Sequence, residues 1–406
     1  MIVIAGGSVL TPAGMTRSDV LVVDGVVASI QPGVDTQGAI VLDASGCLVG
    51  PGFVDLHTHL RDPGQTWKED LSTGSAAAAA GGFTAITAMP NTDPPLDDPK
   101  LLADVAARGR DIGLTEIAVA AAVTRGRAGE EVAPLEDLYQ AGARLFTDDG
   151  DPVANPAVLV EALRRLRRLP GGVLAQHAED RATATGTAAP AAAAEEGMVR
   201  RDLEMLREVG GRYHCQHVSS AGTVDLLRRA REEGLEVTAE ATPHHLTFDD
   251  AGVDRTDPNF KMYPPLRAPH DREALVEAVR EGVIDAVATD HAPHSDEEKA
   301  VGYESAPRGV IGLETAASAV WETLAEPLRF FELLAIAPAR IAGLFGQGQA
   351  IRPGIRANLV LFDPAASWVP RQFASRSRNS PYLGRKMVGV VRATVYQGRI
   401  THEAAS

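Results

Sequence analysis

Two histidines one residue apart, His57 and His59, are the strongest chemical signal in this sequence. They lie in the segment FVDLHTHLRDPG at residues 53–64, whose first residues read as a buried β-strand. Side chains at positions i and i+2 of a strand point to the same face, so both imidazoles would project together from the strand end. Neighbouring imidazoles suit a divalent transition metal. The alternative is a structural pair of histidines that only forms hydrogen bonds. Residues elsewhere in the chain are needed to distinguish these two interpretations.

Further polar side chains follow other predicted strands, each at the carboxyl end of its strand. Eight of the eleven histidines of the chain fall in these segments. In a parallel barrel these ends ring one mouth, where such folds place their active sites. Four histidines and two aspartates there would supply ligands for two divalent metals that activate a water and polarise a carbonyl. Besides His57 and His59, the strand-end residues are Asn91, Asp148, Asp149, His177, His217, His244, His245, Asp290, His291 and His294.

The central part of the chain must supply the strands that position these residues. Eight β-rich segments alternate there with helical stretches rich in Ala, Leu, Arg and Glu. The alternation predicts an α/β fold of the (β/α)8 TIM-type barrel class rather than an open doubly wound sheet. The absence of a glycine-rich phosphate-binding motif weakens nucleotide-binding alternatives. The predicted strands are Phe53–His57, Thr84–Met89, Glu116–Ala121, Arg144–Phe146, Val173–Gln176, Tyr213–Gln216, Glu236–Ala239 and Asp285–Thr289.

The two ends of the chain are β-rich and read alike. Short strands separated by Asp-Gly, Pro-Gly and Ser-Gly signals fill residues 1–48, and similar segments recur in residues 346–406. We therefore expect both ends to build one small β-sandwich domain beside a metal-dependent hydrolase barrel at residues 49–345. The Ala- and Thr-rich stretch 182–196 predicts a flexible surface connection.

Composition excludes several classes of protein. Of the 406 residues, 45% are hydrophobic and 23% are charged, which is ordinary for a globular protein. A formal net charge of −15 without basic runs argues against nucleic acid or an anionic membrane as partner, although a small anionic substrate could bind local cations. Only two cysteines, no signal-peptide pattern and no stretch of ~20 apolar residues predict a cytoplasmic protein.

The ordered motifs resemble those of one family over nearly the whole chain. PGFVDLHTHLRDPG, GGFTAITAMPNT, LFTDDG, HVSS, AEATPHHL, PNFKMYPPLR, DAVATDHAPHSDEEK and SRNSPYLG are similar to segments of dihydroorotases of the bacterial class I type, within the amidohydrolase superfamily. The resemblance implies reversible cyclisation of N-carbamoyl-L-aspartate to L-dihydroorotate, with release of water, in de novo pyrimidine (UMP) biosynthesis. It also implies two Zn²⁺ per chain, bridged by a hydroxide. His57, His59 and Asp290 would bind one ion, and His177 and His217 the other.

Many amidohydrolases bridge their two metals with a carboxylated lysine, and this chain has none in the required place. Its five lysines are Lys68, Lys100, Lys261, Lys299 and Lys386, all remote in sequence from the end of the fourth predicted strand. A carboxylate must then bridge, and Asp149 matches the second aspartate of the class I pair. We expect Asp148, His214, His244 and His245 to support or pack around the site, because the HVS motif favours His217 over His214.

The resemblance extends to catalysis and substrate binding. Asp290 would accept a proton from the attacking water and pass it to the leaving nitrogen. Arg61 can offer a fork of N–H groups to the free α-carboxylate of the substrate. Asn91 and His294 match the other carboxylate contacts of the family.

Two departures from the family pattern bear on this interpretation. Tyr263 stands in place of an asparagine, which predicts a different pocket wall, and the stretch between His177 and His217 is shorter than usual. Other functions stay open: a different cyclic amidohydrolase, such as an allantoinase or dihydropyrimidinase, or a non-catalytic scaffold for aspartate transcarbamoylase. The resemblance also leaves open a homodimer or a complex with that transcarbamoylase.

Overall fold

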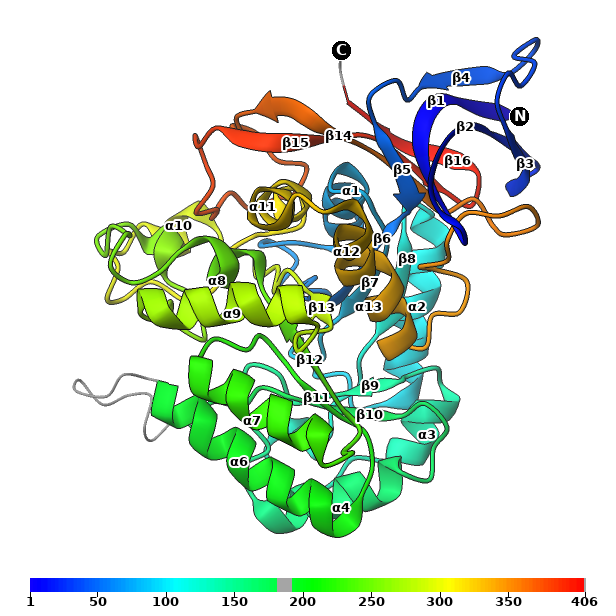
Figure 1. Cartoon of the computed structure of the whole chain (residues 1–406). Coiled ribbons are helices and arrows are strands. Elements are labelled where there is room, and N and C mark those ends of the chain that lie inside the picture. Colours follow the sequence, from blue (N-terminus) through cyan, green and yellow to red (C-terminus); the bar gives the residue numbers. More distant parts are fainter. Residues whose placement is uncertain (181–191, 405–406) are drawn as a thin grey trace.

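Both ends of the chain combine in one mixed sheet, which lies at one side of the molecule in Figure 1. The computed structural model describes residues 1–180 and 192–404. The strand order is β16-β15-β14-β5-β1-β2-β3, with β4 paired to β1. β14 runs antiparallel to β5, so that Val360 faces Gly50 and the two chain ends become neighbours. The strands are β1 (Ile2–Thr11), β2 (Gly14–Val23), β3 (Val26–Gln31), β4 (Ile40–Asp43), β5 (Leu48–Pro51), β14 (Leu359–Trp368), β15 (Met387–Tyr396) and β16 (Arg399–Glu403).

The eight strands predicted for the central part all form, each boundary within two residues of its expected place. They make two parallel sheets, β6-β7-β8 and β13-β12-β11-β10-β9. Isolated parallel bridges join these sheets on both sides, from Ala121 to Phe146 and from Thr58 to His291. The strands are β6 (Phe53–Thr58), β7 (Phe83–Ala88), β8 (Glu116–Val119), β9 (Leu145–Phe146), β10 (Val173–Gln176), β11 (Tyr213–Cys215), β12 (Val237–Ala241) and β13 (Ala286–Val287).

β13 ends at Val287, two residues before its predicted end, and the backbone N–H of Ala288 is the last to donate to β12, to the Ala241 carbonyl at 3.0 Å. The backbone N–H of Thr289 donates to the buried carboxylate of Asp55 at 3.1 Å instead of to a neighbouring strand. That carboxylate also accepts from the backbone N–H of His57 at 3.0 Å. Asp55 therefore ties the end of β6 to the turn that follows β13, where the next polar residues begin.

Helices follow the strands and cover them (Figure 1). Several of their starts are capped by short polar side chains: Asp98 accepts from the backbone N–H groups of Lys100 and Leu101, and Ser220 accepts from that of Thr223. The helices are α1 (Leu71–Ala80), α2 (Pro99–Ile112), α3 (Leu135–Gln140), α4 (Pro156–Leu166), α6 (Ala192–Val209), α7 (Ala221–Glu232), α8 (Pro243–Thr247), α9 (Pro269–Glu281), α10 (Asp296–Lys299), α11 (Ala316–Leu324), α12 (Pro327–Phe331) and α13 (Ala337–Ile341). Short 3₁₀ turns form at Arg125–Arg127 and Pro258–Phe260, and a π-helical turn at Glu332–Ile336.

The low-complexity stretch 182–196 ends as a helix rather than as a connection. Residues 192–196 form the first turns of α6, so the prediction is wrong there; residues 181–191 lie outside the described part of the chain. The reason is Glu195, whose buried carboxylate accepts from the backbone N–H groups of Ser219 and Ser220 at 3.1 Å. No helix within residues 1–180 and 192–404 is long and apolar enough to cross a membrane.

Aromatic rings fill the junction between the mixed sheet and the parallel strands. The Phe53 ring lies edge-on to Phe83 and Phe330, with centroids 5.6 and 5.4 Å apart. Gly82, at φ +90°, passes close to this cluster: a Cβ placed there would lie 2.7 Å from the Phe53 ring and 2.9 Å from Val360 Cγ2. Only glycine satisfies both the backbone angle and the space.

A matched pair of substitutions separates backbone strain from crowding. Gly234 has a similar φ of +80°, and no other atom lies within 4 Å of the position that a Cβ would take, so Gly234→Ala should cost only about 1–2 kcal/mol of unfolding free energy. Gly82→Ala should cost that amount plus about 1–3 kcal/mol for overpacking. Equilibrium urea unfolding of both variants measures the difference. Equal midpoints would contradict the packing at the junction.

Candidate active site

The six residues predicted as metal ligands converge at the carboxyl ends of the parallel strands. His57 lies in β6 with His59 just beyond it, and the others follow β9, β10, β11 and β13. All six are buried, with at most 6% of the surface of any one exposed. The tertiary structure thus brings together side chains that span more than half of the sequence: His57, His59, Asp149, His177, His217 and Asp290.

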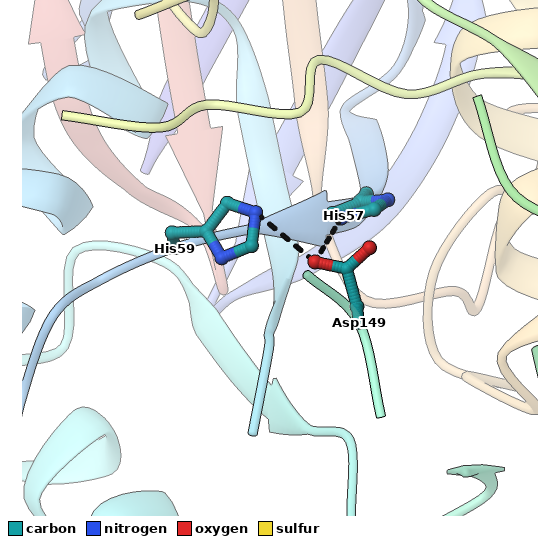
Figure 2. Close-up of side chains that lie close together, drawn as sticks. All are labelled: His57, His59 and Asp149. Atoms are coloured by element: carbon teal, nitrogen blue, oxygen red, sulfur yellow. Dashed lines mark ion pairs between the residues drawn. The ribbon is translucent and has the colours of Figure 1, made fainter. Parts of the chain in front are cut away.

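Asp149 lies at the centre of the cluster and faces two pairs of imidazoles. Its Oδ2 is 3.2 Å from His57 Nε2 and 3.4 Å from His59 Nε2, as Figure 2 shows. Its Oδ1 is 3.3 Å from both His177 Nδ1 and His217 Nε2. In each of the two resulting groups, the ligand atoms lie within 4.8 Å of one another. One carboxylate is therefore shared by two ligand sets, which suits a pair of divalent ions.

Asp290 closes the first of these sets. Its Oδ1 is 2.9 Å from His59 Nε2 and 3.5 Å from His57 Nε2. The backbone that presents it is strained, because Asp290 has a φ of +46°, and the same holds for His217 at +34° and Arg61 at +58°. Residues other than glycine adopt such angles at a cost, and they do so most often where a side chain must be aimed at a functional site.

The buried carboxylates of the cluster require positive charge nearby. Burial alone would raise the pKa of Asp149, yet His57, His177 and His217 hold it well below its ordinary value. Burial would likewise lower the pKa of His57, but Asp149 and Asp290 raise it well above its usual range. Two buried carboxylates are stable only when positive charge compensates them. The buried Nε2 atoms of His57 and His177 also have no hydrogen-bond partner among the described residues. This donor set fits transition-metal ions.

Glu240, on β12, is a functional residue that the sequence reasoning missed. Nδ1–H of His57 donates to its Oε1 at 2.8 Å, and Nε2–H of His214 donates to its Oε2 at 3.0 Å. Burial opposes ionisation, but these two hydrogen bonds lower the pKa of Glu240 to about 2. The carboxylate therefore fixes the His57 tautomer that turns Nε2 toward Asp149. A glutamate inside an otherwise buried strand was the available signal.

The remaining strand-end residues surround the site without joining the ligand sets. Asn91 Oδ1 accepts from Nδ1–H of His59 at 2.8 Å. The carboxylate of Asp148 accepts from the backbone N–H groups of Val123 and Thr124, so it faces away from the imidazoles. Other histidines form hydrogen bonds outside the two ligand sets: His214 with Thr238, His245 with Thr242 and Pro264, and His291 with Glu69.

A cavity of about 210 Å³ opens onto this cluster. Arg61 lines it; its Nε donates to the Pro293 carbonyl at 3.3 Å, and burial lowers its pKa to about 10, so it stays charged near neutral pH. Two further lining residues, Arg308 and Gly309, were not singled out from the sequence. The complete lining is His59, Arg61, Asn91, Asp149, Gly150, His177, Tyr263, Asp290, Ala292, His294, Arg308 and Gly309.

Solved structures with the same fold include hydantoinases and dihydropyrimidinases. L-hydantoinase from Arthrobacter aurescens aligns with a TM-score of 0.88 at 25% identity, over 100% of this chain and 96% of that one. A dihydropyrimidinase from Brevibacillus agri aligns with a TM-score of 0.83 at 24% identity, over 98% of this chain and 94% of that one. These alignments show that the chain shares the α/β fold of these enzymes.

Sequence relatives narrow this class to one family. A family model described as dihydro-orotase-like matches residues 46–222. The chain is 41% identical to a dihydroorotase from Pelotomaculum thermopropionicum, over 98% of each chain, and 43% identical to one from Mycobacterium tuberculosis, over 95% of each. The chain belongs to the dihydroorotase family.

The role of Glu240 can be tested by an isosteric change. Glu240→Gln keeps the shape but removes the charge that orients His57, so metal affinity should fall by about 10–100-fold. Titration of the purified protein against a chelator of known affinity measures the change. Thr238→Val is the control, because it removes a hydrogen bond to His214 without reaching His57. Unchanged metal affinity in Glu240→Gln would contradict the orienting role.

Proposed function

We propose that this protein is a dihydroorotase that reversibly cyclises N-carbamoyl-L-aspartate to L-dihydroorotate, with release of water, in de novo pyrimidine biosynthesis. One observation carries the proposal: the whole ligand set meets around Asp149, in a chain about two-fifths identical to dihydroorotases over nearly its full length. The substrate class that follows is a small molecule with a cyclic amide and a free carboxylate.

The proposed cofactor is a pair of Zn²⁺ ions, two per chain. His57, His59 and Asp290 would hold one ion and His177 and His217 the other, with Asp149 shared between them. When bound, the ions would lower the pKa of a water molecule and polarise the attacked carbonyl. All six ligands come from a single chain, so neither a homodimer nor a complex with aspartate transcarbamoylase is needed to complete the site.

The residues of the chain would supply binding and proton transfer. Burial would raise the pKa of Asp290, but His57 and His59 hold it below its ordinary value, so the carboxylate is ionised near pH 7 and has an oxygen free of its own proton. It would take the proton of the attacking water and deliver it to the leaving ring nitrogen, and reverse these steps in cyclisation. Arg61, Asn91 and His294 line the cavity beside it and would bind the α-carboxylate.

The proposal also includes a closed barrel, a small β-sandwich domain and a cytoplasmic location. The bridges at Ala121 and Thr58 support closure of the parallel sheets into a (β/α)8 barrel at residues 49–345. A separate apolar core drawn from both chain ends supports a β-sandwich of residues 1–48 and 346–406. Both cysteines are free and buried, as suits a cytoplasmic enzyme. The proposed assignment includes no nucleic-acid or membrane partner.

The nearest alternative is another cyclic amidohydrolase with the same fold. A neutral ring such as hydantoin or dihydrouracil carries no carboxylate, so an enzyme for such rings has no need for a half-buried arginine beside the metals. The second alternative, a non-catalytic scaffold, would not require an intact ligand set. Arg61 and the complete set therefore both favour the dihydroorotase.

Substrate comparison tests the proposal directly. The zinc-loaded protein should hydrolyse dihydroorotate at least about 100-fold faster, by kcat/KM, than hydantoin, dihydrouracil or allantoin, because losing the carboxylate leaves buried donors unpaired. Ring opening is followed by ultraviolet absorbance at equal enzyme concentrations. Preference for a neutral ring would assign another amidohydrolase, and no turnover with two metals bound would favour the scaffold.

Removing the shared carboxylate tests the metal assignment. Asp149→Ala should lower metal content below two ions per chain and abolish activity, since this residue is proposed to contact both. Asp285→Ala is the matched control: it removes a carboxylate that pairs with Arg231 at the other end of β13. Elemental analysis after dialysis reads out both variants. Two retained metals in Asp149→Ala would overturn the bridging role.

A further inference from the structure

Arg308 is a cavity-lining cation that no sequence motif assigned a role. Its guanidinium carbon lies 4.4 Å from the ring centroid of Tyr263, within the range of a cation–π contact. The Tyr263 ring in turn lies 4.7 Å from the ring of His177, one of the proposed metal ligands. Within residues 1–180 and 192–404, the Arg308 side chain forms no ion pair. The aromatic ring therefore supports a charged group at the cavity wall that pairs with no acidic side chain of the described residues.

The loop that carries Arg308 is tied to the segment that carries Tyr263. The Nζ of Lys299 donates to the carbonyls of Pro258 and Pro307 at 3.0 and 2.9 Å. The backbone N–H of Gly309 donates to the Lys261 carbonyl at 2.9 Å. These bonds place Arg308 and Tyr263 on one connected wall. These bonds fix the backbone that carries Arg308. The side chain itself is exposed, and its contact with the Tyr263 ring orients the guanidinium, which lowers the entropy cost of using it.

A carboxylate in the cavity needs more donors than the predicted set has ready. Asn91 has its oxygen engaged with His59, which leaves its amide nitrogen. His294 has its Nε2 2.9 Å from the Arg308 carbonyl, an acceptor, so this nitrogen carries the ring proton. Burial, with Arg61, Lys68 and Lys299, lowers the pKa of His294 to about 2, so its Nδ1 is unprotonated near pH 7. His294 can therefore donate to a carboxylate only by leaving that carbonyl.

The small size of the cavity brings Arg308 within reach of the same ligand as Arg61. Its volume of about 210 Å³ is below the ~300–1,000 Å³ usual for ligand sites. A molecule that fills it contacts several walls at once. In a chain of net charge −15, two cavity-lining guanidinium groups that form no ion pair within the described residues favour an anionic ligand.

We propose that Arg308, held on the ring of Tyr263, is a specificity-determining residue that binds the free α-carboxylate of the substrate together with Arg61. This inference rests on the proposed function and deepens it, since it names a further contact for the same substrate. Tyr263 acts as a positioning residue: it supplies the surface on which the guanidinium lies.

Steady-state kinetics of Arg308→Met test the proposal. The KM for dihydroorotate should rise about tenfold or more, as expected for loss of a charge-assisted hydrogen bond. The kcat should stay within about threefold and the metal content unchanged, because Arg308 contacts no proposed ligand. Arg308→Lys should recover part of the KM, and Arg255→Met is the control, since Arg255 is exposed and pairs with Asp250.

Ligand binding without turnover gives a second readout. Calorimetry with orotate and with uracil compares a planar ring bearing the carboxylate with one lacking it. Arg308→Met should weaken orotate about tenfold and leave uracil unchanged. Wild-type protein that is inactive on dihydroorotate would refute the proposed function itself. Active wild type with equal KM and orotate affinity in Arg308→Met would refute only the role of Arg308.

Discussion

The constraint on which this structure depends is a carboxylate buried among four imidazoles. Asp149 is almost fully shielded from water, and each of its oxygens faces two ring nitrogens at 3.2–3.4 Å. A buried charge of this kind is tolerated only where opposite charge is held close to it. The strand ends of the parallel sheets satisfy that need, because they deliver ligands from distant parts of the chain to one mouth.

A ring of supporting hydrogen bonds keeps these ligands in place. Glu240 and Asn91 each accept the distal N–H of a histidine, and Asp55 joins the strand of those histidines to the turn that bears Asp290. The C-terminal part contributes as well. Asn379 accepts from the backbone N–H of His294 and donates to the carbonyls of Ala292 and Gly309. The segment between β14 and β15 therefore braces the loops of the active-site cavity, which links the β-rich ends to the site.

The cavity wall carries positively charged side chains, whereas the molecule as a whole has a negative net charge. The chain is strongly acidic overall, yet Arg61 and Arg308 face the cavity while its two aspartates, Asp149 and Asp290, are engaged with histidines. Positive charge at the cavity wall thus lies beside the two carboxylates that we propose as metal ligands. In the proposed function, this division of charge would favour an anionic substrate over a neutral ring.

The sequence by itself determined the strand pattern, the family and which residues we propose as metal ligands. The His-x-His spacing, the missing lysine after the fourth strand and the ordered motifs are local features. Each can be read from a short stretch of sequence without knowing which distant residues it contacts. Glu240, Asn379 and Arg308 could not be recognised from the sequence, because they contact His57, His294 and Tyr263, which lie 183, 85 and 45 residues away along the chain. The helical state of residues 192–196 likewise goes with a tertiary contact, since the Glu195 carboxylate accepts from the backbone N–H groups of Ser219 and Ser220. Which side chains point into the cavity, and which tautomer each histidine adopts, are set by long-range packing and hydrogen bonding that no short stretch of sequence encodes.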